Sequence, residues 1–380
     1  MSVSYRCWAE VDLDALRNNL MVLRQLAGPS VQVMTVVKAD AYGHGLRQTA
    51  GLLMQSGTDI FGVANLSEAK NIRKVGRGWP ILMLGACLPD EIESAIKDDV
   101  MLTISSLEEA RRISEIGKKL KKKALVHLKV DTGMSRLGCR PDQLADLVSG
   151  IPSFRWVDWV GLFSHFASID SDPRFCRTQR QRFEKALASV RAAGIPLKYI
   201  HLHNSGGVIW EPHEDVNLVR PGSLVYGIIP PSPREAPNGL FEKLVPALSW
   251  KCRVGLVKQI AKGASVSYGR TFMAEHPMKV AILTAGYGDG YMRQGSSRSH
   301  VLIQGKRCPV LGRVTMDQII VDVSGISEPT VGEEAILIGS QGDDRIHVHE
   351  LARWCNTIPL EILTNITYRV PRLYRGAGAS

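Results

Sequence analysis

The chain has 380 residues, of which 44% are hydrophobic and 22% charged, and a formal net charge of +10. This is the balance of an ordinary globular protein with room for about two domains. Seven widely spaced cysteines without a C-x-x-C pattern argue against a disulfide framework or a zinc site. No apolar stretch approaches the length of about 20 residues that a membrane span needs.

The basic residues are scattered along the chain. Their one dense run, at 118–123, lies between a helix pattern and a strand pattern, which favours a solvated connection over a nucleic-acid-binding arm. Residues 1–6 lead directly into a strand pattern, so no secretion signal is expected. We therefore expect a cytoplasmic protein with no metal, membrane or nucleic-acid partner, whose net charge favours anionic ligands.

In chain order, residues 7–13 alternate like a short strand, and a helix follows with Leu16, Leu20 and Leu23 on one face. Eight strand candidates come next, most of them separated by amphipathic helix patterns. They are 31–37, 60–64, 81–84, 101–104, 124–130, 159–164, 199–202 and 223–227. This alternation indicates parallel β/α units, and eight of them within residues 10–239 predict a (β/α)8 TIM-type barrel. A doubly wound sheet is the alternative, but no G-x-G-x-x-G follows the first strand.

The Pro-rich run 230–239 predicts a linker. Beyond it the periodicity changes to strands joined by Gly-containing turns, with one helix pattern near the end. The expected strands are 248–260, 280–284, 300–303, 308–314, 318–323 and 335–339, and the helix is 347–355. Residues 240–380, together with the N-terminal strand 1–9, are therefore predicted to form a mostly antiparallel β domain.

Chemistry in such a barrel lies at the carboxyl ends of its strands. Lys38 ends the β-branched run 31–37, where burial favours a neutral amine, the usual origin of a Schiff-base lysine. The polar residues after the later strands are Lys129, Asp131, Arg136, Ser164, His165, His201, His203, Asn204, Ser205 and Arg220. Because these residues include several cations and histidines but few acids, we predict that the carboxyl end of the barrel binds an anion and contains an amine nucleophile.

The loops Asn204–Gly207 and Arg220–Ser223 are small, Gly-rich and hydroxyl-bearing. Gly-Gly turns are common, so neither loop is informative alone. Backbone amides and hydroxyls there suit a phosphate, which barrels commonly bind after their late strands. Together with a strand-end lysine, the loops indicate a phosphorylated aldehyde cofactor, and pyridoxal 5'-phosphate is the economical candidate.

Seven motifs carry a resemblance to a known family. They are VVKADAYGHG at 36–45, HLKVDTGMSRLG at 127–138, HxHNS at 201–205, RPG at 220–222, YGRTF at 268–272, GYGDG at 286–290 and GRVTMDQ at 312–318. The seven motifs occur in the same order as in the alanine racemase family and extend over nearly the whole chain, which therefore resembles that family. The resemblance implies a barrel followed by a β domain, pyridoxal phosphate, and interconversion of L- and D-alanine for peptidoglycan. It also implies a homodimer in which the partner's C-terminal domain completes each active site.

Racemisation needs two bases on opposite faces of a planar centre. By resemblance, Lys38 carries the cofactor and serves D-alanine, while Tyr268 serves L-alanine. A tyrosine of ordinary pKa, near 10, is a poor base, so nearby cations should lower it. Arg220 matches the partner of the pyridine nitrogen; it keeps its proton, which favours racemisation over transamination. His165 matches a residue that orients Arg220.

The remaining roles are also implied by the resemblance. Arg136 and the Met316 backbone amide would meet the substrate carboxylate. The other cofactor contacts would be Tyr42, Asn204, Ser205, Gly222 and Ser223. The residues around the substrate entrance would be Tyr287, Arg293, Arg313 and Asp317. In some members the lysine matching Lys129 is carbamylated and steadies the arginine at 136.

Leu360 departs from the family, which commonly has a tyrosine there that touches the cofactor phosphate. Leucine predicts weaker cofactor retention and a wider substrate range, so a broader-specificity or serine racemase is one alternative. A non-catalytic pyridoxal-phosphate carrier is another, although such carriers resemble the barrel alone. A decarboxylase of the same plan is a third, but it would carry an acid in place of Arg220.

Overall fold

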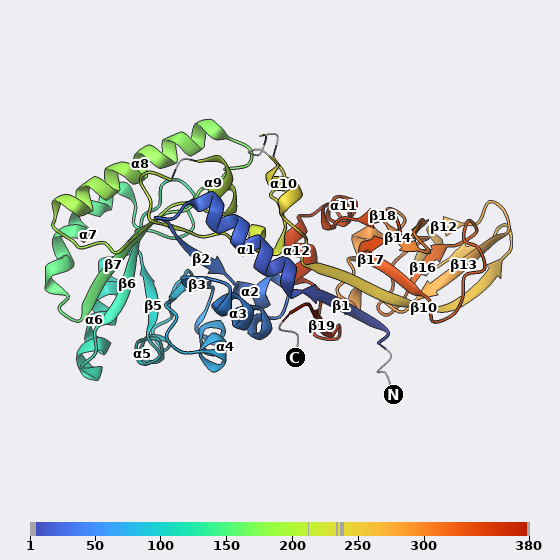
Figure 1. The fold of residues 1–380 in the computed structure, drawn as a ribbon, viewed down its shortest axis with the longest axis horizontal. Coiled ribbons are helices and arrows are strands. Elements are labelled where there is room, and N and C mark those ends of the chain that lie inside the picture. Colours follow the sequence, from blue (N-terminus) through green and yellow to red (C-terminus); the bar gives the residue numbers. More distant parts are fainter. Residues whose placement is uncertain (1–4, 212, 233–234, 236–238, 378–380) are drawn as a thin grey trace. The chain divides into compact units, whose positions relative to one another are not determined.

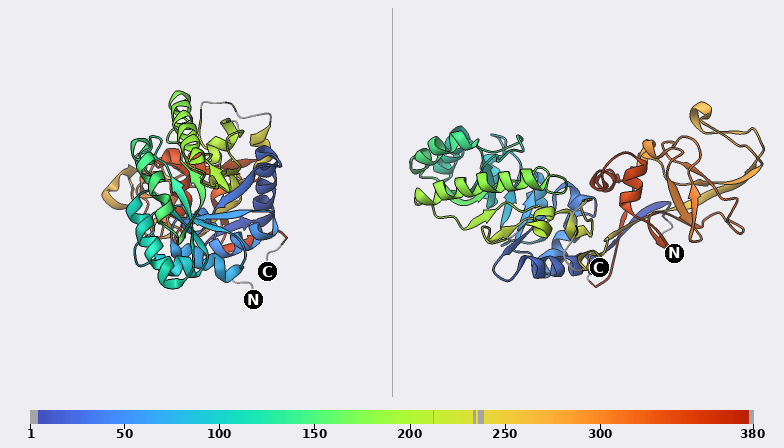
Figure 2. Two further views of the ribbon diagram at one scale, coloured as in Figure 1. Left: turned by 90° about the vertical axis from the view of Figure 1, so that its left-hand side faces the viewer. Right: turned by 90° about the horizontal axis from the view of Figure 1, so that it is seen from above.

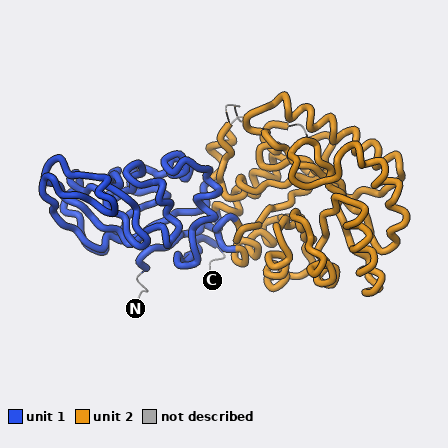
Figure 3. Tube along the Cα trace, turned by 180° about the vertical axis from the view of Figure 1, so that it is seen from behind, with its two compact units in different colours: residues 1–14, 42–45, 246–380 blue, residues 15–41, 46–245 orange. Residues whose placement is uncertain are grey.

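The computed structural model describes residues 5–211, 213–232, 235 and 239–377 (Figure 1). Figure 3 shows the chain divided into two compact units. Unit 2 contains residues 15–41 and 46–245, and unit 1 contains residues 1–14, 42–45 and 246–380. Each unit is described by itself below.

Unit 2 contains an eight-stranded parallel sheet within its described residues, and the strands pair in chain order. They are β2 (Gln32–Val36), β3 (Ile60–Val63), β4 (Ile81–Met83), β5 (Val100–Ile104), β6 (Ala124–Lys129), β7 (Val157–Phe163), β8 (Tyr199–His201) and β9 (Leu218–Val219). Helices flank the strands (Figures 1 and 2). They are α1 (Leu13–Ala27), α3 (Leu46–Gln55), α4 (Leu66–Val75), α5 (Ile92–Lys97), α6 (Leu107–Leu120), α7 (Leu144–Gly150), α8 (Pro173–Ala192), α9 (Ser205–Trp210) and α10 (Leu240–Lys243). The predicted barrel fold is confirmed.

The barrel closes between its last two strands through hydrogen bonds that flank them. The Asn217 amide donates to the Ile200 carbonyl (3.1 Å), and the Arg220 amide donates to the His203 carbonyl (2.9 Å). The Asn217 side chain accepts from the Ile200 amide (2.7 Å) and donates to the Lys198 carbonyl (2.8 Å). A side chain therefore substitutes for part of the backbone ladder where β9 is short.

The prediction of the eighth strand at 223–227 was wrong. Ser223–Tyr226 is a 3-10 turn (η3), ended by Gly227 in the left-handed region (φ 72°). The strand is β9, whose two residues pair with Gln32 and Val33 of β2. A short apolar run does not distinguish a buried turn from a strand, and Tyr226 is buried as a turn residue whose hydroxyl donates to the Val36 carbonyl.

Unit 1 is built on the long strand β10 (Leu248–Ile260), which pairs with three other strands. The other strands of its main sheet are β1 (Cys7–Asp12), β13 (Met278–Leu283), β14 (His300–Ile303), β15 (Lys306–Pro309), β16 (Ile319–Asp322), β17 (Glu334–Gln341), β18 (Asp344–Ile346) and β19 (Arg372–Arg375). All pairings are antiparallel except β1 with β19. A separate hairpin joins β11 (Ser265–Val266) to β12 (Phe272–Met273). The predicted mostly antiparallel β architecture is confirmed.

Two helices lie near the end of unit 1. The first, α11 (Val348–Trp354), was predicted, but the second, α12 (Pro359–Thr364), was missed. The predicted linker 230–239 includes residues 233, 234 and 236–238, which lie outside the described residues. Over the part of the chain that is described, no helix combines the length and the apolar character that crossing a membrane requires.

Asn217 provides a test of the barrel seam. We expect Asn217→Ala to lower the free energy of unfolding by about 2 kcal/mol, because it leaves the Ile200 amide and the Lys198 carbonyl without their partner. Asn71→Ala is the matched control; this half-buried side chain donates to the Ser67 carbonyl on α4 and accepts from Arg47, and because both hydrogen bonds are exposed to solvent their loss should change stability by less than about 0.5 kcal/mol. Urea denaturation of both variants measures the difference, and equal losses would contradict the assigned role of Asn217.

Candidate active site

Lys38 lies at the carboxyl end of β2, where the chain makes an unusual turn. Residues 39–42 all have φ between 52° and 54°, so the short helix α2 (Lys38–Tyr42) is wound left-handed. Without glycine such a turn costs about 1–2 kcal/mol per residue. Lys38 itself is half-buried, and burial first and the positive charge of Arg136 second lower its pKa.

Three hydrogen bonds hold this turn in place. The Ala41 amide donates to the Val37 carbonyl (2.9 Å), and the Ala39 amide donates to Glu68 Oε1 (2.8 Å). Asp40 Oδ1 accepts from the Leu46 amide (2.7 Å) and so begins α3. Strain at this position, balanced by specific acceptors, is typical of a functional site.

The loop after β6 presents Arg136. Asp131 Oδ1 accepts from the amides of Gly133, Met134 and Ser135 at 2.9–3.1 Å, and the Cys139 amide closes the loop by donating to the Lys129 carbonyl (2.8 Å). Arg136 is exposed on this ordered loop. Asp131 is therefore the residue that shapes the loop, a role the sequence did not indicate.

Arg220 is 3% exposed and lies among neutral acceptors. Its Nη2 donates to the Ser164 carbonyl (2.7 Å) and the Leu202 carbonyl (3.1 Å) and lies 3.3 Å from His165 Nδ1. Its Nη1 lies 2.8 Å from His201 Nδ1, and its guanidinium lies 5.4 Å from the centre of the Phe163 ring. Burial lowers the pKa of Arg220 to about 9, so it stays protonated at neutral pH.

His201 is the closer imidazole partner of Arg220 (2.8 Å, against 3.3 Å for His165), and the sequence singled out only His165 for this role. Because a guanidinium only donates, His201 Nδ1 must accept, and its proton is then on Nε2. That nitrogen lies 2.8 Å from His127 Nδ1, so His127 in turn carries its proton on Nε2. The Cβ that any other residue would add at Gly161 would lie 2.2 Å from His127 Nδ1, so glycine is required there.

The electrostatic field of this end of the barrel is strongly positive. Burial first, and then the charges of Arg220, Lys129, Arg136 and Lys38, hold the pKa of His165 well below its usual range. Burial and the same cationic neighbours lower the pKa of Lys129 to about 7. The structure thus brings together the predicted barrel residues and favours the neutral forms of His165 and His201.

The two predicted phosphate loops are joined by hydrogen bonds. Ser205 Oγ accepts from the amides of Gly222 (2.9 Å) and Leu224 (3.5 Å), and Ser223 begins the turn η3. Asn204 caps α9 by accepting from the Gly207 amide (3.0 Å). Adjacent helix and turn starts that expose amides and hydroxyls are a suitable cradle for phosphate.

These residues fit pyridoxal phosphate. The described residues include no acceptor for the Arg220 Nε–H, which leaves a donor on a fixed cation for a ring nitrogen. The amine of Lys38 makes no hydrogen bond to a described side chain, and its lowered pKa suits a covalent bond to an aldehyde. The hydroxyls of Ser205 and Ser223 are the candidate phosphate donors, because the Gly222 amide already donates to Ser205 Oγ.

The predicted residues of unit 1 form two adjoining groups around the segment 312–317. Tyr268 begins the 3-10 turn η4 (Tyr268–Arg270) and is 68% exposed. Ser267 Oγ donates to the Arg313 carbonyl (2.6 Å), which fixes this turn against the segment. The Tyr287 amide donates to the Thr315 carbonyl (3.0 Å), so η5 (Tyr287–Asp289) contacts the same segment.

Met316 and Asp317 lie at the far end of this segment. Met316 is 52% exposed, and its carbonyl accepts from the Gly288 amide (2.8 Å). Asp317 accepts from Arg369 (2.7 Å), and the neighbouring Tyr368 is 96% exposed, an aromatic side chain that the sequence did not single out. Arg293 is exposed at the start of η6 (Arg293–Gly295).

Tyr42 and Leu360 belong to a third region of unit 1. Gly43 (φ 82°) follows Tyr42, and a Cβ at Gly43 would lie 2.2 Å from the Leu363 carbonyl, so the 42–45 loop packs directly on α12. Arg372 Nε donates to the Gly43 carbonyl (3.0 Å). Leu360 is half-buried in the first turn of that helix.

A parallel barrel with a lysine at one strand end, a buried arginine and phosphate-type loops, followed by a β unit, defines a class of pyridoxal-phosphate enzymes. The chain matches the family model "Alanine racemase, N-terminal domain" over residues 11–230 and "Alanine racemase, C-terminal domain" over residues 247–374. It belongs to the alanine racemase family.

Relatives agree over almost the whole chain. A curated alanine racemase of Symbiobacterium thermophilum is 40% identical over 98% of both chains, and one of Methanococcus maripaludis is 37% identical over 98% of this chain and 99% of its own. Among solved structures, the alanine racemase from Streptomyces lavendulae has a TM-score of 0.92 at 33% identity, covering 99% of this chain and 98% of that one.

The neutral histidines predict a pH dependence of stability. Burial and Arg220 lower the pKa of His127 to about 3 from its ordinary 6.5. Between pH 6.5 and 3 the unfolded chain therefore binds a proton that the folded chain does not, and this residue destabilises the fold by about 1.4 kcal/mol per pH unit as the pH falls.

Two variants separate this effect from the hydrogen bond to His201. In both His127→Gln and His127→Phe, the free energy of unfolding should fall less steeply than in the wild type as the pH decreases below 6.5. At pH 8, only His127→Phe should lose about 1–3 kcal/mol, because it leaves the His201 Nε2–H unpaired. Urea unfolding at pH 8, 6 and 5 tests both, and slopes parallel to that of the wild type would exclude a neutral His127.

Proposed function

We infer that the protein is an alanine racemase that uses pyridoxal 5'-phosphate to interconvert L- and D-alanine and so supplies D-alanine for peptidoglycan. The observation that carries this inference is the buried Arg220, held by neutral acceptors and protonated, in a chain related to alanine racemases over its whole length. When bound, pyridoxal phosphate withdraws electron density from the α-carbon of the amino acid, and this makes its proton removable.

We propose that Lys38 holds the cofactor and exchanges the α-proton on the D side. A base must be neutral before it accepts a proton, and the lowered pKa of Lys38 provides that form. Arg220 would donate its Nε–H to the ring nitrogen, and a protonated guanidinium does not transfer that proton. The nitrogen then stays unprotonated, which limits the electron sink and favours return of the proton to the same carbon.

Tyr268 is proposed as the base on the L side, contributed by a second copy of the chain. The exposed aromatic and Met side chains of unit 1 support an interface there; they are Tyr268, Tyr287, Met316 and Tyr368. Arg136, exposed on its ordered loop, is proposed to bind the substrate carboxylate with the Met316 amide. Arg293, Arg313 and Asp317 would line the entrance.

Lys129 is proposed as a carbamylation site. Its pKa of about 7 gives a substantial neutral fraction, which is the form that reacts with carbon dioxide. A carbamate would carry negative charge among Arg136 and Arg220, where the ammonium is repelled.

Two experiments test this function: covalent labelling of the cofactor-binding lysine, and exchange of the α-proton of alanine with solvent deuterium. Purified protein should be yellow, and borohydride should fix the cofactor on the peptide containing Lys38; a label on Lys129 would contradict the assignment. Tyr268→Phe should impair solvent-deuterium exchange from L-alanine by at least about 100-fold while that from D-alanine falls far less, because one base is removed.

Mixing inactive Lys38→Ala and Tyr268→Phe proteins tests the shared site. A hybrid dimer would contain one intact Lys38–Tyr268 pair, so activity should rise toward about a quarter of that of the wild type if subunits exchange at random. Subunit exchange is verified with differently tagged chains. Exchange without recovery would exclude the shared site.

A broader substrate range is a second candidate function, favoured by Leu360. Its helix α12 packs on the loop that begins with Tyr42, a proposed phosphate contact. Leu360→Tyr should strengthen cofactor binding by about 1.5–3 kcal/mol, the value of a hydrogen bond to a charged group. It should also raise the alanine-to-serine ratio of kcat/KM, and Leu360→Met, which adds no hydroxyl, should do neither. Unchanged values for Leu360→Tyr would remove Leu360 as the specificity position.

A further inference from the structure

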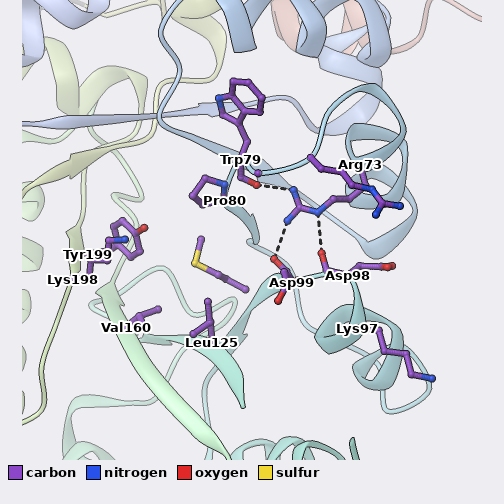
Figure 4. A pocket seen from close by; sticks show the side chains of 13 residues that line it. Arg73, Trp79, Pro80, Lys97, Asp98, Asp99, Leu125, Val160, Lys198 and Tyr199 are labelled. Carbon is purple, nitrogen blue, oxygen red and sulfur yellow. Dashed lines mark hydrogen bonds between the residues drawn. The ribbon is translucent and has the colours of Figure 1, made fainter. Parts of the chain in front are cut away.

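A second pocket opens at the amino end of the barrel strands, opposite the end that carries Lys38. Its volume is about 570 Å³, within the usual range of small-molecule sites. Figure 4 shows Pro80, Leu125, Val160 and Tyr199 arranged around it. Pro80 directly precedes β4, Leu125 is the second residue of β6, Val160 is the fourth residue of β7, and Tyr199 is the first residue of β8.

The interior of the pocket is apolar and accessible. Leu125, on the same face of β6 as His127 and Lys129, is 38% exposed, which is high for a residue that points into a barrel. Met101 and Val160 pack in the cluster beside it. A ligand that covered these side chains would remove apolar surface from water.

Tyr199 supplies a polar group to this apolar space. Its side chain is 97% buried (3% exposed) and stacks on His127 with ring centres 5.3 Å apart. Within the described part of the chain, no residue donates to or accepts from its hydroxyl, although it lines the pocket. The hydroxyl therefore remains available to a molecule that enters the pocket.

The charge at the mouth selects an anion. The Lys198 ammonium lies 5.1 Å from the centre of the Tyr199 ring, and Arg77 is exposed on the rim; neither forms an ion pair with a described residue. Two acidic side chains on the rim would repel an anion, but neither faces the apolar interior unpaired. Asp99 forms an ion pair with Lys122 (2.8 Å), and the Asp98 side chain points away from the apolar residues in Figure 4.

One wall of the pocket is held rigid by Arg73. Its guanidinium donates to the carbonyls of Trp79 (2.6 Å), Asp98 (2.9 Å) and Asp99 (2.9 Å), which joins the loops before β4 and β5 (Figure 4). All three nitrogens are thus used within the protein, so Arg73 shapes the pocket and leaves ligand binding to Lys198 and Arg77. The cavity is formed in advance of binding, which limits the entropy lost on association.

We propose that this pocket binds a small carboxylate that carries an aromatic or branched apolar group. The apolar group would cover Met101, Leu125 and Val160, and a carboxylate oxygen would accept from the Tyr199 hydroxyl beside the Lys198 ammonium. This site is separate from the proposed catalytic end, so it stands whether or not the protein racemises alanine.

Benzoate is the probe, and its binding is measured by saturation-transfer NMR and calorimetry on the full chain with its cofactor. Binding should persist in saturating D-alanine, because the two sites lie at opposite ends of the barrel. Tyr199→Phe should weaken it about tenfold through loss of a hydrogen bond to a charged group. Lys198→Met should weaken it about threefold, while Lys119→Met, an exposed lysine of α6 outside the pocket, should not.

Val160→Phe should weaken binding at least about fivefold by occupying the apolar surface that the ring of benzoate would cover, and benzamide, the neutral counterpart of the probe, should bind at least about fivefold more weakly than benzoate. Thermal unfolding establishes that each variant is folded. Loss of benzoate binding in saturating D-alanine would assign it to the catalytic end and overturn the proposal. Equal affinities of the wild type, Tyr199→Phe and Val160→Phe would also overturn it.

Discussion

A buried cation without an acid is the constraint on which the barrel interior depends. Arg220 is 3% exposed, and its neighbours are two carbonyls, two imidazoles and the face of Phe163. An isolated buried charge is very costly unless hydrogen bonds replace its hydration. Each neighbour must therefore accept or remain neutral, and this requirement fixes the tautomer of His201 and, through it, that of His127. The same charge, together with burial, lowers the pKa values of Lys129 and His201.

The period of a strand explains how this constraint reaches both ends of the barrel. Leu125, His127 and Lys129 lie on one face of β6, and their side chains occupy successive levels along the interior. Leu125 lines the amino-end pocket, His127 contacts His201, and Lys129 lies near Arg136 and Arg220. Gly161 on the neighbouring strand leaves space for the middle level, because any side chain there would overlap the His127 ring.

The sequence predicted what periodicity and strand ends encode. Seven of the eight barrel strands, Lys38 and the positive carboxyl end follow from apolar runs and from the residues after them. The eighth strand was misplaced, because Leu218–Val219 is too short to form a pattern and depends on the side chain of Asn217. His201 was passed over as the partner of Arg220, since its role depends on a tautomer that only spatial neighbours determine. The amino-end pocket was not predicted either, because its lining comes from five separate loops and strands.

The left-handed turn after Lys38 was also invisible in the sequence, and its energetics show why it persists. Ala39, Asp40 and Ala41 have no intrinsic preference for positive φ comparable to that of glycine. The turn is stable because its amides find acceptors in Val37 and Glu68, and because Asp40 caps the following helix. Glu68 also raises the pKa of Lys38, opposing the larger effects of burial and Arg136. The carboxylate of Glu68 therefore both accepts a hydrogen bond from the strained turn and limits how far burial and Arg136 lower the pKa of Lys38.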